Sequence, residues 1–373
     1  MPGCVAGPCL APVAPAPSRG AARLDRCGSI ASRSASGKSG RVPIMEPRHD
    51  LAHEVDADAA WSESYYFNAY DPSSDSGFFT RVGIRPNEGT MDVGLSVWLP
   101  GGDLAEYRHV VECHEMLGPP LDVGGVRYEL LEAMRRWRLV ADVEATARRC
   151  GPTSEDRWPV RVALDVTFEA LSPAVGSDGQ SGTGPRSDES RAAATTTGKG
   201  HFEQAGRWTG ALTVDGVTHE WSNARGNRDR SWGPRRWGEP TMWRWFSINI
   251  GDELHLGGIR LGTDAGDLHR GWVSAGGHVT SVRRWDLTTE LEDDQLTHRV
   301  MHLSVTDKAD RTHELTGRVL RVADIGRPGG TVVNEGLTEW TYQDAEGNAK
   351  VGYGIGEYLH QVDAAGRPRV PVT

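Results

Sequence analysis

The sequence lacks an excess of positive charge, and it lacks long apolar segments. Its 373 residues carry 41 lysines and arginines against 51 acidic residues, a formal net charge of −10. A nucleic-acid-binding protein needs a basic face to neutralise phosphates, so we expect no nucleic-acid partner. No apolar run reaches the 18 residues that a membrane-spanning helix requires. We therefore expect a cytoplasmic protein without membrane insertion, either a monomer or a homo-oligomer.

Cysteines are few and scattered. Three of the five fall within the first 45 residues, and the other two are not spaced as a zinc site or a redox pair. We therefore expect free thiols in a reducing cytosol rather than a disulfide framework. The five are Cys4, Cys9, Cys27, Cys113 and Cys150.

The motifs of several enzyme classes are also missing. The chain has no G-x-S-x-G nucleophile elbow and no H-E-x-x-H zinc motif. The run "GYGIGEY", residues 352–358, resembles a dinucleotide-binding loop, but no helical pattern follows it. The 13 histidines show no H-x-H spacing. We therefore expect neither a metal site nor a cofactor.

Two segments of low complexity divide the chain. Residues 1–45 are rich in Pro, Ala, Ser and Gly, and they are expected to be a disordered tail or to precede a natural start at Met45. Residues 171–200 are small, polar and patternless, as in a flexible linker or a long surface loop. The sequence therefore predicts one β domain over residues 46–170 and a second over 201–373.

The remaining segments favour strands over helices. In "PVRVALDVTFEA", apolar and polar residues alternate with period two from Val160 to Phe168, which is typical of an antiparallel strand with one wet face. Residues 128–145 are interpreted as two strands, and residues 49–60 as a short helix. Many short runs separated by Gly/Asp turns predict an all-β protein, with two antiparallel β-barrel or sandwich domains and few short helices.

The segment "GNRDRSWGPRRWGEPTMWRWF", residues 226–246, concentrates tryptophan and arginine around one acid, Asp229. A structural interpretation pairs Asp229 with an arginine or with loop backbone, and lets Trp232 plug the end of a barrel. A functional interpretation makes the segment the wall of a site. Both remain open.

The strand that follows carries large residues on both faces. Trp243 and Trp245 share one face, and Arg244 and Phe246 share the other. The tryptophan face would line a cavity, or one face would meet a neighbouring domain.

The run "VGYGIGEYLHQ" adds further candidates near the C-terminus. Tyr353 and Glu357 are expected on one face of a strand, opposite His360. A Glu357 that faces the inside of a barrel would lose water and hold its proton more tightly, as a general acid must. The alternative is a charge on a wet strand face.

The tripeptide Asn-Glu-Gly occurs in "RPNEG", residues 85–89, and in "VNEGL", residues 333–337. A turn with glycine at positive φ explains both occurrences.

Five segments together resemble a widespread actinobacterial family with tandem lipocalin-like domains, which is similar to the carotenoid 1,2-hydratase (hydroxyneurosporene synthase) group. The resemblance covers residues 62–361. In that family the tryptophan corner has the pattern G-H-R-D-x-S-W-G, and this chain has Asn227 in place of the histidine, which puts a mechanism through an imidazole there in doubt. The segments are "ESYYFNAYDPSSDSGFFTRVGIRPNEGTMDVGL", "YELLEAMRRWRL", "HFEQAGRWTGALTVDG", "GNRDRSWGPRRW" and "YGIGEYLHQ".

The resemblance implies two lipocalin-like domains, an apolar ligand site and cofactor-free chemistry. With the aromatic and acidic residues above, it predicts a hydratase or dehydratase of an isoprenoid or terpenoid alkene or alcohol, which would act through a carbocation-like state. The alternatives are a non-catalytic lipid or terpenoid carrier, and an isomerase or cyclase in the same pocket. The second domain, or its interface with the first, is expected to hold the ligand. The candidate catalytic residues are Asp229, Glu357, Tyr353 and His360; the candidate substrate-binding residues are Asn227, Arg228, Trp232, Trp243, Arg244, Trp245 and Phe246.

Overall fold

Period-two alternation builds the sheets of this protein, as the strand β8 (Arg157–Ala170) shows. Alternate residues from Val160 to Phe168 are buried, whereas Arg161 and Asp165 between them are exposed. The computed structural model describes residues 42–150, 156–179, 187–327, 330–344 and 346–372. Most of the expected N-terminal tail, residues 1–41, lies outside the described residues.

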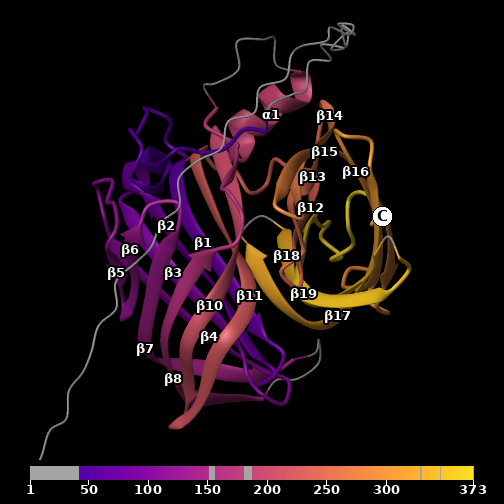
Figure 1. Cartoon of the computed structure of the whole chain (residues 1–373). Coiled ribbons are helices and arrows are strands. Elements are labelled where there is room, and N and C mark those ends of the chain that lie inside the picture. The colour runs from indigo at the N-terminus through magenta and orange to yellow at the C-terminus, as the bar shows by residue number, and fades with distance from the viewer. Residues whose placement is uncertain (1–41, 151–155, 180–186, 328–329, 345, 373) are drawn as a thin grey trace, which may run out of the picture. The chain divides into compact units, whose positions relative to one another are not determined.

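The first half of the described chain forms one antiparallel sheet of eleven strands (Figure 1). Its order is β4-β3-β2-β1-β11-β10-β8-β7-β6-β5, and β9 pairs with β10. The sheet curls on itself, because β4 also pairs with β7. Besides β8, its strands are β1 (Trp61–Asp71), β2 (Ser76–Arg85), β3 (Thr90–Trp98), β4 (Asp103–Glu112), β5 (Leu121–Val123), β6 (Val126–Glu132), β7 (Arg136–Arg149), β9 (Val175–Ser177), β10 (Gly200–Val214) and β11 (Val217–Pro234).

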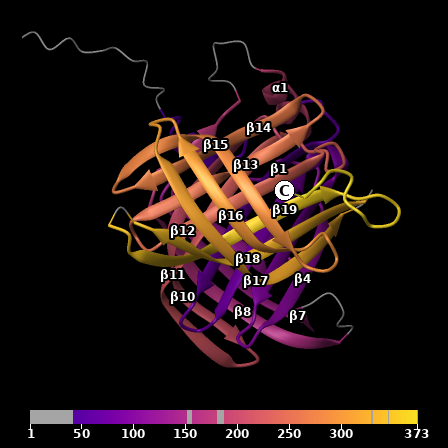
Figure 2. The same ribbon diagram turned by 90° about the vertical axis from the view of Figure 1, so that its right-hand side faces the viewer.

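The remaining strands form a closed antiparallel barrel in sequence order, from β12 round to β19 (Figure 2). The pairing of β12 with β19 closes it. The strands are β12 (Met242–Ile250), β13 (Leu254–Thr263), β14 (Gly266–Ala275), β15 (His278–Leu291), β16 (His298–Asp307), β17 (Thr312–Arg327), β18 (Thr331–Gln343) and β19 (Ala349–Gln361). The expected all-β class with lipocalin-like barrels is confirmed.

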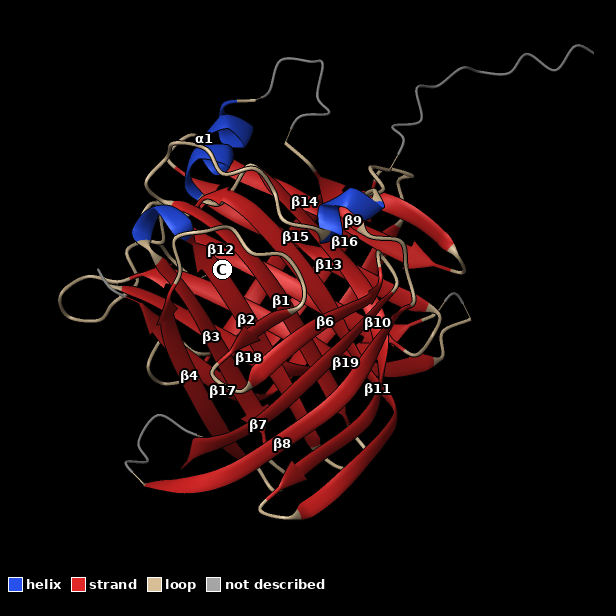
Figure 3. Ribbon diagram, turned by 90° about the vertical axis from the view of Figure 1, so that its left-hand side faces the viewer, coloured by secondary structure: helices blue, strands red, loops and turns tan. Residues whose placement is uncertain are grey.

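Helices are short in the described residues (Figure 3). They are the 3-10 turns Pro47–Asp50 and Pro86–Glu88 and the α-helix α1 (Asp188–Thr196). The helix expected over 49–60 is therefore wrong beyond its first turn, whereas the two strands expected within 128–145 are confirmed as β6 and β7.

The sheets divide the chain after Pro234, which corrects the division expected at residues 171–200. β10 and β11 follow that segment in sequence, yet they pair with β8 and β1 of the first sheet. The described part of the segment contains β9 and α1, which begins after Ser187, whose side chain accepts a hydrogen bond from the Ser190 backbone. A long excursion between two strands of one sheet is as polar as a linker between domains, so composition alone does not separate them.

Three of the five apolar clusters among the described residues define the layers of the structure. One lies inside the curled first sheet and includes Trp137 and Trp208. A second fills the barrel around Phe246 and Trp285. A third lies between the two, where outer faces of the first sheet, such as that of Tyr66, meet outer faces of the barrel. This third layer holds the candidate site.

Candidate active site

Strand register places a row of polar residues across the outer face of the first sheet. Arg81 on β2 lies opposite Tyr66 on β1, Tyr66 lies opposite Asp229 on β11, and Asp229 lies opposite Glu203 on β10. Directly paired residues of antiparallel strands point to the same face. The four side chains therefore face the barrel, and all four line one cavity of about 800 Å³.

A second row on the barrel forms the opposite wall. Trp245 on β12 lies opposite Glu357 on β19, and Glu357 lies opposite Glu335 on β18. Trp243 precedes Trp245 by two residues and shares its face. All four residues line the same cavity. The cavity thus lies between the first sheet and the barrel.

Glu203 reaches from the first sheet to the barrel wall. Its Oε1 accepts a hydrogen bond from the Trp245 indole nitrogen at 2.7 Å, and its Oε2 accepts one from Trp272 at 3.1 Å. Gly257 makes the approach possible, because a Cβ at that position would clash with Glu203 Oε2. Burial raises the pKa of Glu203 to about 7, since the loss of water outweighs the two indole hydrogen bonds. Glu203 can therefore carry a proton near neutral pH.

His201 and Asp229 form a pair beside Glu203. Nε2 of His201 lies 3.0 Å from Asp229 Oδ2 and 3.9 Å from Glu203 Oε1. Burial opposes protonation of the imidazole, but the hydrogen bond and charge of Asp229 outweigh it and raise the pKa of His201. The His201 side chain is 37 % exposed and lines the cavity, so it is accessible to a bound molecule.

The barrel wall holds a second pair of carboxyl groups. Glu335 and Glu357 are hydrogen-bonded to each other, Tyr66 donates to Glu335 Oε2 at 3.3 Å, and the Trp243 indole nitrogen donates to Glu357. Burial raises the pKa of Glu357. The cavity therefore has a carboxyl group of raised pKa on each wall.

Four of the residues singled out in the sequence lie on the cavity wall: Asp229, Glu357, Trp243 and Trp245. Of the two positions that the sequence left open for Glu357, the structure shows the outward one, but the first sheet covers this face, so Glu357 is buried from water. The expected face division of β12 and β19 is confirmed, and so is the alternative that the tryptophan face meets the neighbouring unit.

Four other candidates lie elsewhere in the barrel. Arg244, Phe246 and His360 point inward: the Arg244 guanidinium lies 4.3 Å from the Tyr358 ring, and Phe246 packs in the barrel core. Burial lowers the pKa of His360 to about 3, which makes it a neutral interior group. The fourth, Tyr353, donates to Glu339 Oε2 at 3.3 Å outside the cavity wall.

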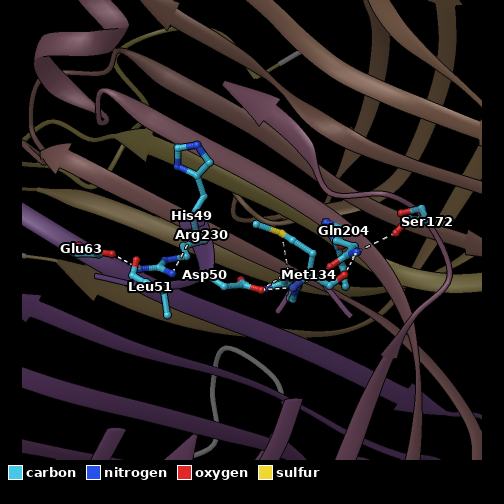
Figure 4. A network of polar contacts seen from close by, with 10 residues as sticks. His49, Asp50, Leu51, Glu63, Met134, Ser172, Gln204 and Arg230 are labelled. Atoms are coloured by element: carbon cyan, nitrogen blue, oxygen red, sulfur yellow. Dashed lines mark hydrogen bonds and ion pairs between the residues drawn. The ribbon is translucent and has the colours of Figure 1, made fainter. Parts of the chain in front are cut away.

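Arg228 lies on the other face of β11 and points into the first sheet. Its guanidinium donates to Asp50 Oδ1 at 2.5 Å and to Gln204 Oε1 at 2.7 Å. Asp50 also accepts a hydrogen bond from the backbone of Met134, as Figure 4 shows. Asn227 is buried and accepts from the Gln204 backbone at 3.1 Å, away from the cavity wall. Both residues hold the sheet together.

Trp232 also lies on that other face. Its ring stacks on His53 with 3.8 Å between centroids, and Arg230 beside it donates to the backbone oxygens of His49 and Leu51 (Figure 4). The two faces of the tryptophan corner thus differ, and Asp229 pairs with His201 rather than with an arginine or loop backbone. Side chains on one face of β11 bind the segment that begins at residue 42, and the other face carries Asp229 into the cavity.

Sequence reasoning missed several cavity residues, above all His201, Glu203 and Arg235. The sequence predicts a turn with glycine at positive φ at both Asn-Glu-Gly tripeptides. This is correct for Gly89, whose φ is 72°, whereas Glu335 and Gly336 lie within strand β18. The available signal was the spacing of His201 and Glu203, which places both on one face of a strand.

Two further properties hold for the described part of the chain. No group of three or more His, Cys, Asp or Glu residues is arranged to hold a metal ion. No helix there is long and apolar enough to cross a membrane.

The chain belongs to the family described as a domain of unknown function, DUF7064, whose model matches residues 46–362. None of the curated proteins matches the chain.

Solved structures share the fold. A candidate AttH from Nitrosomonas europaea has a TM-score of 0.57 at 14 % identity, with 87 % of this chain and 98 % of that chain covered. Kievitone hydratase from Nectria haematococca has a TM-score of 0.54 at 12 % identity, with coverage of 86 % and 93 %. CghA with Sch210972 has a TM-score of 0.51 at 16 % identity, with coverage of 81 % and 88 %. At these low sequence identities, the structural matches establish likeness of fold alone.

Proposed function

We propose that this protein is a cofactor-independent hydro-lyase, which adds water to, or removes it from, an isoprenoid-like alkene or alcohol in the cavity between the first sheet and the barrel. One observation carries the proposal: a buried carboxyl group whose pKa is raised to about 7, Glu203, lies on the wall of a tryptophan-lined cavity beside a hydrogen-bonded His201–Asp229 pair. The fold that the chain shares with a hydratase, and its resemblance to the carotenoid 1,2-hydratase group, also support it.

In the direction of dehydration, protonated Glu203 gives its proton to the hydroxyl oxygen of a tertiary alcohol. The C–O bond breaks, its electron pair leaves with the oxygen as water, and a carbocation remains. The faces of Trp243 and Trp245 stabilise that cation. Neutral His201 accepts a proton from the adjacent carbon and becomes an imidazolium that the Asp229 carboxylate stabilises, and the electrons of that C–H bond form the alkene.

The proton must then return from the pair to Glu203. His201 Nε2 and Glu203 Oε1 are 3.9 Å apart, a separation that a modest side-chain movement closes. Hydration follows the same steps in reverse order. Either direction needs one group that gives a proton and one that accepts it, and the raised pKa values of Glu203 and His201 suit both roles.

In the test, the full chain is incubated with isoprenoid tertiary alcohols and their alkenes in normal and oxygen-18 water. The products are then analysed by gas chromatography with mass detection. We expect turnover with incorporation of the label into the alcohol. Glu203→Gln should abolish it, Asp229→Asn should reduce it by about a hundredfold, and the exposed control Glu220→Gln should leave it unchanged.

The pH profile adds an independent readout. Dehydration should fall as the pH rises through about 7, where Glu203 loses its proton. Ligand binding without product from any substrate would refute the hydro-lyase and favour a carrier. Full activity of Glu203→Gln together with loss in Glu357→Gln would place the acid on the barrel wall and contradict the assignment.

A further inference from the structure

Arg235 is a cation on the cavity wall without an ion-pair partner among the described residues. It follows β11 directly, and its guanidinium lies 4.7 Å from the Trp237 ring and 5.6 Å from the Trp243 ring. Its Nη1 donates to the Thr197 backbone oxygen at 2.9 Å, while its buried Nε–H has no partner in the described structure. A guanidinium offers five N–H donors, so most of the binding capacity of Arg235 is unused.

Other cations on the same wall differ from Arg235. Lys199 is paired with Asp56, and Arg85 lies 2.6 Å from Asp92. These two side chains are neutralised by neighbours in the protein. Arg235 differs from them because its buried Nε–H has no partner and no acidic side chain pairs with it in the described structure.

A second guanidinium stands near the first. Arg81 also lines the cavity, is 3.5 Å from Asp92, and has a buried Nε–H without a partner in the described structure. Burial and, after it, the charge of Arg81 lower the pKa of Arg235 to about 10, and the effect of Arg81 is larger than that of either Asp229 or Glu357 in raising it. Arg81 shares the single carboxylate of Asp92 with Arg85 and is therefore only partly neutralised, so an anion between Arg81 and Arg235 would relieve the repulsion between them.

Space for such an anion lies beside Arg81. Gly94 is its direct partner on β3 and lines the cavity, and a Cβ at Gly94 would meet nothing within 4 Å. The row from Arg81 to Glu203 spans three strand spacings, so their backbones are about 14 Å apart. A molecule with its charged end at Arg81 can therefore present a carbon far along its chain to Glu203.

We infer that the substrate is an amphiphilic anion: an isoprenoid-like chain whose acidic head group is held by Arg235 and Arg81, with its reacting carbon near Glu203. This inference rests on the proposed use of the cavity as the substrate site. The inference specifies the substrate class of the proposed function, because a carrier or hydro-lyase of neutral terpenoid alcohols has no need of the two guanidinium groups. The distance along the row separates a head group at Arg81 from a reaction centre at Glu203.

The test compares the binding of acids with that of their methyl esters by titration calorimetry at pH 8. Geranic, farnesoic and palmitoleic acids are the anionic probes, and farnesyl monophosphate tests whether a phosphate head replaces a carboxylate. We expect the full chain to bind at least one acid or the phosphate about ten to a hundred times more tightly than the matching neutral ester or alcohol. Arg235→Gln should remove this preference without weakening the binding of the neutral probe, and Arg235→Lys should restore part of it.

The neighbouring Arg236→Gln is the matched control, because Arg236 pairs with Asp58 and does not line the cavity. It should keep the preference. Equal affinity for charged and neutral probes, or failure of every anionic probe to bind, would overturn the inference. Arg81→Gln provides a second variant should Arg235→Gln melt at a lower temperature.

The two proposals fail separately. Turnover of neutral alcohols without a preference for anions would leave the hydro-lyase intact and refute the anionic substrate. A preference for anions that Arg235→Gln removes, without turnover, would support the anion site and refute the hydro-lyase.

Discussion

Replacement of Glu203 by glutamine should change the pH dependence of stability. The pKa of Glu203 is raised from 4.5 to about 7 by burial. The folded protein therefore binds this proton more tightly than the unfolded chain does. The contribution of this proton to the free energy of unfolding is fully present below pH 4.5 and is lost as the pH rises through about 7. The Glu203→Gln variant lacks this titrating group, so its free energy of unfolding has no such pH-dependent contribution.

The magnitude follows from the shift. One pKa unit corresponds to about 1.4 kcal/mol, so the full change is about 3 kcal/mol, of which about 2.5 kcal/mol develops between pH 5 and pH 8. Over that interval the free energy of unfolding of the wild type should fall by about 2.5 kcal/mol more than that of Glu203→Gln. Subtraction of the two curves removes, to first order, the contributions of the other titrating groups.

Urea unfolding followed by tryptophan fluorescence at pH 5, 6, 7 and 8 measures this difference. The exposed Glu220→Gln should follow the wild type at every pH. Parallel curves for the wild type and Glu203→Gln would mean that Glu203 titrates in the folded protein as it does in the unfolded chain. In that case Glu203 could not be a proton donor near neutrality, and the proposed mechanism would fail with it.

Two further predictions concern the sheet and the cavity. Asp50→Asn leaves the buried guanidinium of Arg228 without its counter-charge and should lower the free energy of unfolding by about 3 to 5 kcal/mol in the same urea assay; a smaller loss than 1 kcal/mol would show that water reaches the pair. Gly94→Leu should keep the melting temperature within about 2 °C, because its Cβ meets open space, yet weaken farnesoic acid binding at least about tenfold. Gly226→Ala, by contrast, would drive a Cβ into the Asn68 backbone and should lower the melting temperature without a specific effect on binding.

The faces of individual strands could be predicted from the sequence. Period two separated Trp243 and Trp245 from Arg244 and Phe246, and the structure places the first pair on the cavity and the second inside the barrel. Alternation gives this result because each strand residue must point to one of two sides. It does not tell which side is the barrel interior, which is why the sequence left both an inward and an outward Glu357 open.

The partners across the cavity could not be predicted. Glu203 meets Trp245 and Trp272, which lie 42 and 69 residues further along the chain. Their meeting depends on how the barrel packs against the first sheet, and no local pattern records that. Composition likewise placed the division of the chain near residues 171–200, because it does not register that β10 and β11 complete the first sheet.

The position of the cavity follows from how the two units are packed. Large apolar side chains fill the inside of each, with Trp208 in the first sheet and Trp285 in the barrel. A reactive group on an outer strand face is normally exposed to water, and its pKa then stays near the ordinary value. Where two outer faces meet, as at Glu203, the same group loses its water but keeps an open space in front of it. The shift in the pKa of Glu203 is thus a property of the paired units, and a chain cut after Pro234 should lose both the cavity and the shift.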